Sequence, residues 1–587
     1  MRPPSRIPPL VAIGVFACAP LMAQDAQPAP VPPRVQFTQV MPPARPVRYD
    51  GAQGSTYIPL DSWMYPEILR LYSLGYIDTL FLGIRPYTRT AVAHMLDESA
   101  GRIYNSNSDE AKEIFTALRR ELDPDMELPI DAHIGHAEIG SLYTRTLGIT
   151  GAPLRDSYHA GATIVNDYGR PYAEGFNNIT GVSLRATAGR YSAYFRGEYQ
   201  HAPALWGYSR DVAAHLTFQD EIIVLNPYNP TLPYGESLSS VNTFRMQEGY
   251  VAANFANHEF SFGKTDDWWG PGRGAGMGYS NNAEDIYSFR INRVEPLHIP
   301  LISRVLGPIR YDFMYGSLQG HTAWNHPYTH SEGFGLKPTP NLELGFERTI
   351  IFGGKGHSPV TLHTFLKGFF DINDTSFPEK IGRDDPGARF SAFYFSYRVP
   401  FVRDWLTLYS DSEDHDDVTP ISAPRRAAIR PGIYLSHFPR ANQLSLRVEA
   451  ASTDPPTGRS IHGSFMYWEA EQRQAYTNKG ALFGDWIGRE GKGGQAWLTW
   501  HLSGQEWLEL QYRTAKAAKD FIPDGTTQND LVVNAVKRLG KDVELNAWVQ
   551  YERWKAPYLI NGNTAAQHDT SIAVQLTLYP RNSLRRY

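Results

Sequence analysis

The sequence predicts a mainly β protein: one large antiparallel transmembrane β-barrel in a bacterial outer membrane, with a small N-terminal helical bundle. Three observations support this fold class. The chain begins with a segment typical of an export signal, its apolar and polar residues alternate from about Ile130 almost to the C-terminus, and it contains 34 tyrosines and 13 tryptophans. Together they favour a membrane barrel, whose apolar face points to lipid, over a soluble sandwich, whose apolar face points into a core.

Residues 1–23 have the order of a secretory signal peptide. Two arginines precede an apolar stretch from Leu10 to Ala17, and small residues lead to a cleavage candidate after Ala23. Cys18, the one cysteine of the sequence, falls within this signal, so the mature chain is expected to have no disulfide and no cysteine metal ligand. Lipoprotein processing at Cys18 is the alternative. No later stretch offers about twenty uncharged apolar residues, which excludes a membrane-spanning helix.

Two further segments precede the barrel. Residues 24–54 are rich in proline, alanine and glutamine and lack apolar periodicity, which predicts an extended linker. Residues 55–125 follow a helical period and predict three amphipathic helices: one from Asp61 to Tyr76, one after Pro86, and one from the cap Ser108 that stops at Pro124. Because three such helices bury little surface alone, we expect a periplasmic plug that depends on the barrel.

Residues 126–587 are assigned to the barrel because their apolar period is two. One clear stretch is 571–578, where isoleucine, valine and leucine alternate with serine, alanine, glutamine and threonine. Tyrosine and tryptophan suit the interfacial girdles of such a barrel. Closure of the sheet also removes the unpaired edges that lipid does not tolerate.

Charge and motif content exclude several classes of function. A formal charge of -5 and a pI near 6.4 give no basic field for nucleic acid. His133 and His136 lie on opposite faces of an expected strand, so we predict no metal site. The glycines of 270–278 and 354–356 lack the spacing of nucleotide-binding loops, so no cofactor is expected.

The strongest candidate for ligand binding is the segment 266–273. Its aromatic rings could stack on sugar faces and its charged groups could bind hydroxyls and carboxylates. Its proline and glycines predict a loop rather than a regular strand. Packing or a girdle position for the two tryptophans is an equal alternative. Arg290, in the next expected strand, is added to this set. The predicted polysaccharide-binding residues are therefore Asp266, Asp267, Trp268, Trp269, Arg273 and Arg290.

Two more polar sets are weaker candidates. Arg290, Arg398 and Arg447 fall on the inward phase of alternating stretches and could clamp uronic acids. The alternative, which is favoured for each residue taken singly, is a structural ladder against glutamates such as Glu343, Glu347 and Glu449. The acidic run from Asp411 to Asp417 matches no calcium loop, and we expect a solvated loop there.

Four segments, in order along the chain, resemble the Wzi-like capsule assembly proteins. They are IPLDSWMYPEILRLYSLGYIDTLFLGIRPYTR (58–89), FGKTDDWWGPGRGAGMGYSNNAEDI (262–286), KPTPNLELGFERTIIFGG (337–354) and RRAAIRPGIYLSHFP (425–439). The resemblance implies an eighteen-stranded outer-membrane barrel, closed on the periplasmic side by a helical bundle, that binds capsular polysaccharide without cleaving it. The chain departs from the usual barrel pattern at its C-terminus, where Pro580 interrupts the last expected strand.

The leading hypothesis is therefore a non-enzymatic, monomeric lectin-like protein that contacts outer-membrane lipid and capsular or extracellular polysaccharide. A porin for small solutes is the first alternative, favoured if the lumen is open. An outer-membrane enzyme is the second, and the sequence offers no serine, histidine and aspartate arrangement to support it.

Overall fold

The computed structural model describes residues 53–126, 135–220, 232, 234–370, 375–415, 423–459, 461–580 and 583–586. The predicted signal peptide and nearly all of the predicted linker lie outside these residues. The described residues all belong to one unit of the chain, Tyr49–Tyr587.

An antiparallel sheet of eighteen strands closes on itself, which confirms the predicted fold class. Each strand pairs with its neighbour along the chain, and β2 closes the barrel by pairing with both β5 and β26. The strands are β2 (Gly135–Thr150), β5 (Gly175–Ala188), β6 (Tyr191–Ala202), β9 (Val241–Phe255), β10 (His258–Lys264), β12 (Tyr287–Arg293), β13 (Ile309–Ser317), β14 (Tyr328–Thr339), β15 (Leu342–Phe352), β16 (Ala388–Arg398), β17 (Leu406–His415), β18 (Ala428–Leu435), β19 (Leu444–Ser452), β22 (Gly491–Ser503), β23 (Glu506–Ala517), β24 (Thr526–Arg538), β25 (Val543–Lys555) and β26 (Gln567–Leu578).

The apolar phase of the strands faces outwards. On β26, the side chains of Ile572 and Val574 are 54% and 46% exposed, whereas those of Ser571 and Ala573 are 1% exposed. A soluble sandwich would bury the first pair and expose polar neighbours. This inverted arrangement is that of a barrel whose outer surface meets lipid. None of the described helices is long and apolar enough to cross a membrane.

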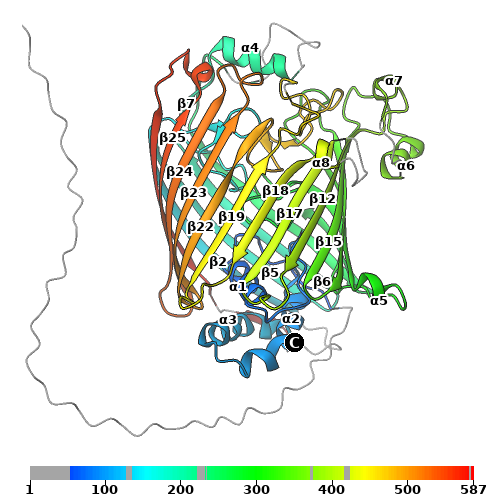
Figure 1. The fold of residues 1–587 in the computed structure, drawn as a ribbon, viewed down its shortest axis with the longest axis vertical. Helices are drawn as coiled ribbons and strands as arrows, with labels where there is room; N and C mark the ends of the chain where they lie inside the picture. The colour runs from blue at the N-terminus through cyan, green and yellow to red at the C-terminus, as the bar shows by residue number, and fades with distance from the viewer. Residues whose placement is uncertain are drawn as a thin grey trace, which may run out of the picture. The chain divides into compact units, whose positions relative to one another are not determined.

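The two ends of the barrel differ in their connections. Figure 1 shows α1 (Met64–Ser73), α2 (Arg89–Tyr104) and α3 (Asp109–Met126) at the lower end of the barrel. It shows α4 (Arg210–Gln219), α6 (Leu362–Phe370) and α7 (Phe377–Lys380) at the upper end. Turns such as 189–190 and 256–257 are short, whereas connections such as 203–240 and 453–490 are long. Outer-membrane barrels have short periplasmic turns and long extracellular loops. By this rule, the end of the barrel that carries α1, α2 and α3 is the periplasmic end. The remaining short helices are α5 (Ser303–Leu306), α8 (Ala423–Arg426) and η2 (Pro557–Ile560).

Three helices form where the sequence predicts them: α1 (Met64–Ser73), α2 (Arg89–Tyr104) and α3 (Asp109–Met126). The predicted cap Ser108 accepts a hydrogen bond from the Ala111 backbone N–H at 3.1 Å. The predicted stop at Pro124 is wrong, because α3 continues to Met126. A proline removes one N–H bond to the preceding turn and its ring strains that turn, but the residues after it still complete a last half-turn.

The apolar faces of α1, α2 and α3 are buried mainly against one another. Their shared cluster is drawn from residues 58–122, with Val294 as its contribution from the rest of the chain. This is more mutual burial than the sequence predicts for three short helices. Polar contacts then join them to the periplasmic turns, for example Glu113 to the Gly504 N–H at 2.8 Å and Arg120 to Asp542 at 2.7 Å. The division at 55–125 stays a prediction.

Three long connections fold into the lumen and pack there: 151–174, 265–286 and 453–490. They carry the small strands β3 (Arg155–Asp156), β4 (Gly161–Ala162), β11 (Trp268–Trp269), β20 (Thr477–Asn478) and β21 (Ala481–Leu482), while β7 (Leu205–Trp206) and β8 (Ser237–Leu238) lie in the 203–240 connection. Tyr467 donates to the Met277 carbonyl at 3.0 Å, and Tyr158 donates to the Arg473 carbonyl at 2.8 Å. The connections thus bind one another as well as the barrel wall.

The C-terminal segment resumes the barrel after Pro580. Strand β27 (Ser583–Arg586) pairs with residues 135–138 of β2, beyond the part of β2 that pairs with β26. The proline therefore interrupts the last strand without ending its pairing, since a proline removes one ladder donor.

Candidate functional site

Trp268 and Trp269 form the two-residue strand β11 inside the barrel. It pairs with β1 (Ile84–Arg85) of the N-terminal segment. Because successive residues of a strand point to opposite faces, the two rings separate. The fully buried Trp269 ring meets Tyr279 edge-on at 5.2 Å, whereas the Arg85 guanidinium lies 4.9 Å from the Trp268 ring. The predicted loop is confirmed for the rest of 266–273, which folds into the lumen, and is wrong at these two residues, because β1 supplies the backbone partners of a strand.

Asp266, Asp267 and Arg290 bind other parts of the lumen. Arg290 is fully buried on β12 and lies between two carboxylates, 2.9 Å from Asp267 and 2.5 Å from Asp312. Asp266 accepts a hydrogen bond from the Leu60 backbone N–H at 2.6 Å. In these positions the three residues hold the 265–286 connection to the wall and to the N-terminal segment. Their contact with a glycan stays a prediction.

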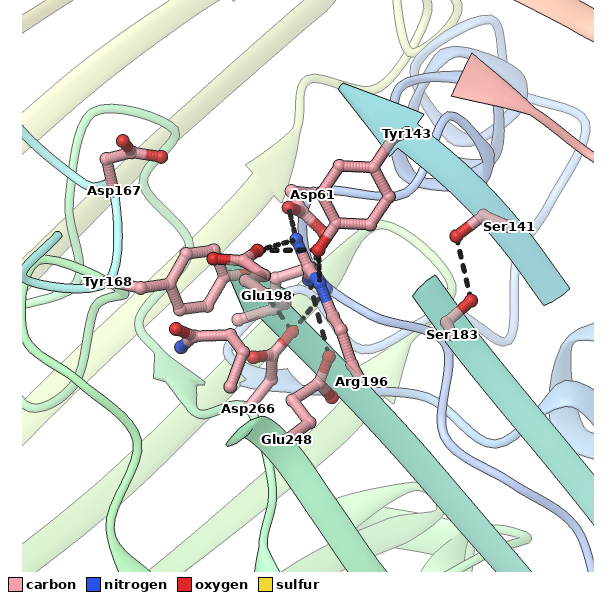
Figure 2. Close-up of polar contacts among 12 residues, drawn as sticks. Asp61, Ser141, Tyr143, Asp167, Tyr168, Ser183, Arg196, Glu198, Glu248 and Asp266 are labelled. Atoms are coloured by element: carbon pink, nitrogen blue, oxygen red, sulfur yellow. Dashed lines mark hydrogen bonds and ion pairs between the residues drawn. The ribbon is translucent and has the colours of Figure 1, made fainter. Parts of the chain in front are cut away.

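Figure 2 shows a polar cluster around Arg196 of β6 that the sequence analysis missed. Its guanidinium forms an ion pair with Asp61 at 2.5 Å, donates to the Tyr143 hydroxyl at 2.8 Å and lies 3.4 Å from Glu248. Asp266 belongs to the same cluster, where burial and the neighbouring Asp61 carboxylate raise its pKa to about 6. The inward phase of residues 191–202 is the signal that could have found Arg196, since its alternate side chains are buried.

Arg273 reaches open space inside the barrel. It forms two hydrogen bonds with the Glu509 carboxylate of β23, at 2.7 and 2.8 Å, and its side chain is 37% exposed. It lines two cavities: one of about 230 Å³, which Trp268 also lines, and one of about 300 Å³, whose lining includes Arg145 and Trp497. Trp268 and Arg273 are thus the predicted site residues that face these cavities.

Two of the inward-facing residues bind the backbone of the last turn of α1 and of the segment that follows it. Arg398 donates to the carbonyl oxygens of Tyr72 and Ile77, each at 3.1 Å. Glu343 accepts the backbone N–H groups of Leu82 and Gly83 at 2.8 and 2.9 Å. Both side chains fix the N-terminal segment in the barrel, which is a structural role.

Glu449 forms an expected arginine–glutamate pair, but its partner is Arg430, which was not among the arginines singled out from the sequence. Glu449 lies 2.9 Å from Arg430 of the neighbouring strand, and Arg430 also binds Asp485 at 2.6 Å. Arg447 instead lies 4.0 Å from the centre of the Tyr434 ring and donates to Tyr409 at 3.3 Å.

The acidic run beginning at Asp411 forms part of β17 as far as residue 415, so the predicted solvated loop is wrong there. Asp411 and Glu413 are buried, and Asp411 accepts the Met277 backbone N–H at 2.7 Å. A Cβ atom at Gly270, where φ is 120°, would lie 2.2 Å from the Asp411 carboxylate. The close approach of the two segments therefore requires glycine. The last two positions of the run lie outside the described residues.

Over the parts of the chain that the structure describes, no group of three or more histidine, cysteine, aspartate or glutamate residues could hold a metal ion. The carboxylates described above bind arginines and backbone N–H groups instead. The arrangement holds lumenal segments in place and leaves polar, aromatic-lined cavities beside them.

These features define an outer-membrane β-barrel whose lumen is filled by its own connections and N-terminal segment. The chain belongs to the Wzi capsule assembly protein family, whose pattern matches residues 146–569. This confirms the resemblance seen in the sequence.

A curated relative is an uncharacterized 55.8 kDa protein from the cps region of Klebsiella pneumoniae. It is 27% identical over 186 residues, which cover 31% of this chain and 36% of the relative, so the match spans about a third of that relative's length.

Among solved structures, the chain is similar to Wzi of Escherichia coli, described as a carbohydrate-binding β-barrel involved in group 1 capsule assembly. The TM-score is 0.64 at 16% identity, covering 90% of this chain and 100% of the other. OccAB3 of Acinetobacter baumannii gives a TM-score of 0.40 at 10% identity, over 77% of this chain and 99% of the other.

Proposed function

We propose that this protein binds capsular or extracellular polysaccharide at the cell surface and holds it there without cleaving it. Its family and the carbohydrate binding described for the E. coli relative support this proposal. In the same proposal the protein is a monomer, its outward strand faces contact outer-membrane lipid, and residues 1–23 are removed on export.

The observation that carries the proposal is the packed lumen. Four aromatic rings are buried in one cluster inside the barrel, in the order Trp269, Tyr279, Phe483 and Tyr476, with the centroids of successive rings 4.3 to 5.2 Å apart. A conduit for solutes needs an open path, whereas a binding protein needs a fixed outer surface. The packing therefore favours binding over passage.

The extracellular connections are also joined to one another by buried charges. His159 of the 151–174 connection lies 3.0 Å from Asp220 of the 203–240 connection, and Arg489 of the 453–490 connection forms an ion pair with the same Asp220 at 2.5 Å. Connections fixed in this way offer a polysaccharide a surface that loses little conformational entropy on binding.

The test compares cells of a capsule-producing host that lack the gene with cells that carry it. The expected result is that the gene increases cell-bound polysaccharide and decreases released polysaccharide, while the polysaccharide keeps its chain length on incubation with the purified protein. Planar-bilayer recordings on the same preparation should show no stepwise conductance. Unchanged retention at normal barrel abundance would contradict surface binding, and stable conductance steps would favour the porin alternative.

A further inference from the structure

The cavity of about 230 Å³ lies at the periplasmic end of the lumen. Its lining comes from α1, from β1, from the 265–286 connection and from strands β18, β19, β22 and β23. Binding of polysaccharide at the outer surface does not require this cavity. Its lining combines arginines with aromatic rings.

Two of its arginines have no carboxylate partner among the described residues. Arg85 donates to the carbonyl oxygens of Gly270 and Gly272, each at 2.9 Å, and its Nε atom is buried without a hydrogen bond. Arg447 has a hydroxyl and aromatic rings as its neighbours, and its Nε atom is also buried without a hydrogen bond. Burial, together with the like charge of Arg447, lowers the pKa of Arg85. Buried charges without partners are unfavourable, and an anion would relieve them.

The acidic residues of the lining do not balance these two charges. Glu509 is held by Arg273 through two hydrogen bonds. Burial raises the pKa of Glu67 well above its usual range, which favours its neutral form. Glu449 interacts electrostatically with Arg447, but its carboxylate is bound by Arg430. The cavity therefore carries excess positive charge.

Aromatic side chains supply the second element of recognition. Trp268, Trp507 and Tyr434 line the same cavity. Aromatic rings bind the C–H faces of sugars, and arginine binds carboxylates through paired hydrogen bonds. We propose that the cavity binds a small sugar acid, with the sugar ring against Trp268 or Trp507 and the carboxylate at Arg85 and Arg447.

The ligand can come from two sources that share this chemistry: a free monosaccharide acid, or the end of an acidic oligosaccharide. The site lies within the lumen and does not depend on polysaccharide binding at the outer surface. Loss of sugar-acid binding therefore does not predict loss of surface retention, and the two proposals are tested by separate readouts.

The experiment titrates the full-length protein in detergent with D-glucuronate, D-glucose and trigalacturonate, and follows binding by calorimetry and tryptophan fluorescence. Glucuronate is expected to bind at least about tenfold more tightly than glucose, because a hydrogen-bonded charge pair contributes a factor of that size. Trigalacturonate that binds as tightly as glucuronate identifies a chain end as the ligand, and exclusion of the trisaccharide identifies a free sugar acid.

Variants locate the site. R447Q is expected to weaken glucuronate binding about tenfold or more. The matched control is R145Q, which removes an inward-facing arginine that lines the other cavity, and it should leave binding unchanged. If R447Q does not assemble, S445F, which fills the cavity from β19, should abolish binding instead. Equal binding of glucose and glucuronate would overturn the proposal. So would normal glucuronate binding by R447Q or, where R447Q does not assemble, by S445F.

Discussion

Replacing Trp269 with alanine is expected to loosen the lumen, whereas replacing Trp268 is expected to leave it packed. Trp269 is fully buried, and truncating such a ring costs about 3–5 kcal/mol of stability. Trp268 borders a cavity of about 230 Å³, so part of its ring already faces open space. Less packing is lost there, and we expect W268A to cost less than about half as much.

The two variants are compared by heat-modifiability on gels, by thermal unfolding in detergent and by planar-bilayer conductance. W269A should unfold at lower temperature and conduct, while W268A should stay close to wild type in both assays. W206A is the control for loss of a tryptophan, since that ring is 70% exposed. Equal destabilisation by W268A and W269A would refute the separation of the rings. If a stably folded variant that carries both W268A and W269A no longer retains polysaccharide, the segment 266–273 binds glycan directly.

Two further predictions concern contacts that fix the lumen. E343L removes the acceptor of two backbone N–H groups in the segment 74–88, which should lower the free energy of unfolding by about 3 kcal/mol and speed proteolysis of that segment. E343Q keeps one acceptor oxygen, so its effect should be intermediate. Burial alone would lower the pKa of His159, but Asp156 and Asp220 raise it to about 10. Its stabilisation is therefore complete below about pH 6.5 and lost as pH rises through 10. The unfolding temperature should fall over that range, and H159Q should flatten the profile; an unchanged slope would contradict this.

The barrel could be predicted from sequence because its signal is local. Alternation such as that of residues 571–578 determines which side chains face outwards, and closure follows from the need to pair every edge in lipid. The helices could also be predicted from sequence, since the Ser108 side chain marks a helix cap by its chemistry alone. The extent to which the helices bury one another could not be predicted, because periodicity gives the width of an apolar face and not what covers it.

The site could be predicted only in part, because its geometry depends on contacts between distant segments. Proline and glycine after Trp269 indicate a loop, yet β1, nearly two hundred residues earlier, makes a strand of the tryptophan pair. For the same reason the sequence placed both rings in one site, while the structure assigns Trp269 to the packed interior and Trp268 to a cavity.

Arg430 and Arg447 show where the sequence stops being informative. They lie on neighbouring strands, and the pattern of either strand predicts only that its arginine faces inwards. The fold gives Arg430 two carboxylates, Glu449 and Asp485, and gives Arg447 aromatic rings and a hydroxyl. An inward charge that the fold pairs with carboxylates, as it does Arg430, is already balanced. Arg447 instead lies near Arg85, which also has no carboxylate partner among the described residues, and beside a cavity, so these two arginines can bind an anion. Arg430 and Arg447 thus differ in the partners that the fold gives them and not in residue type.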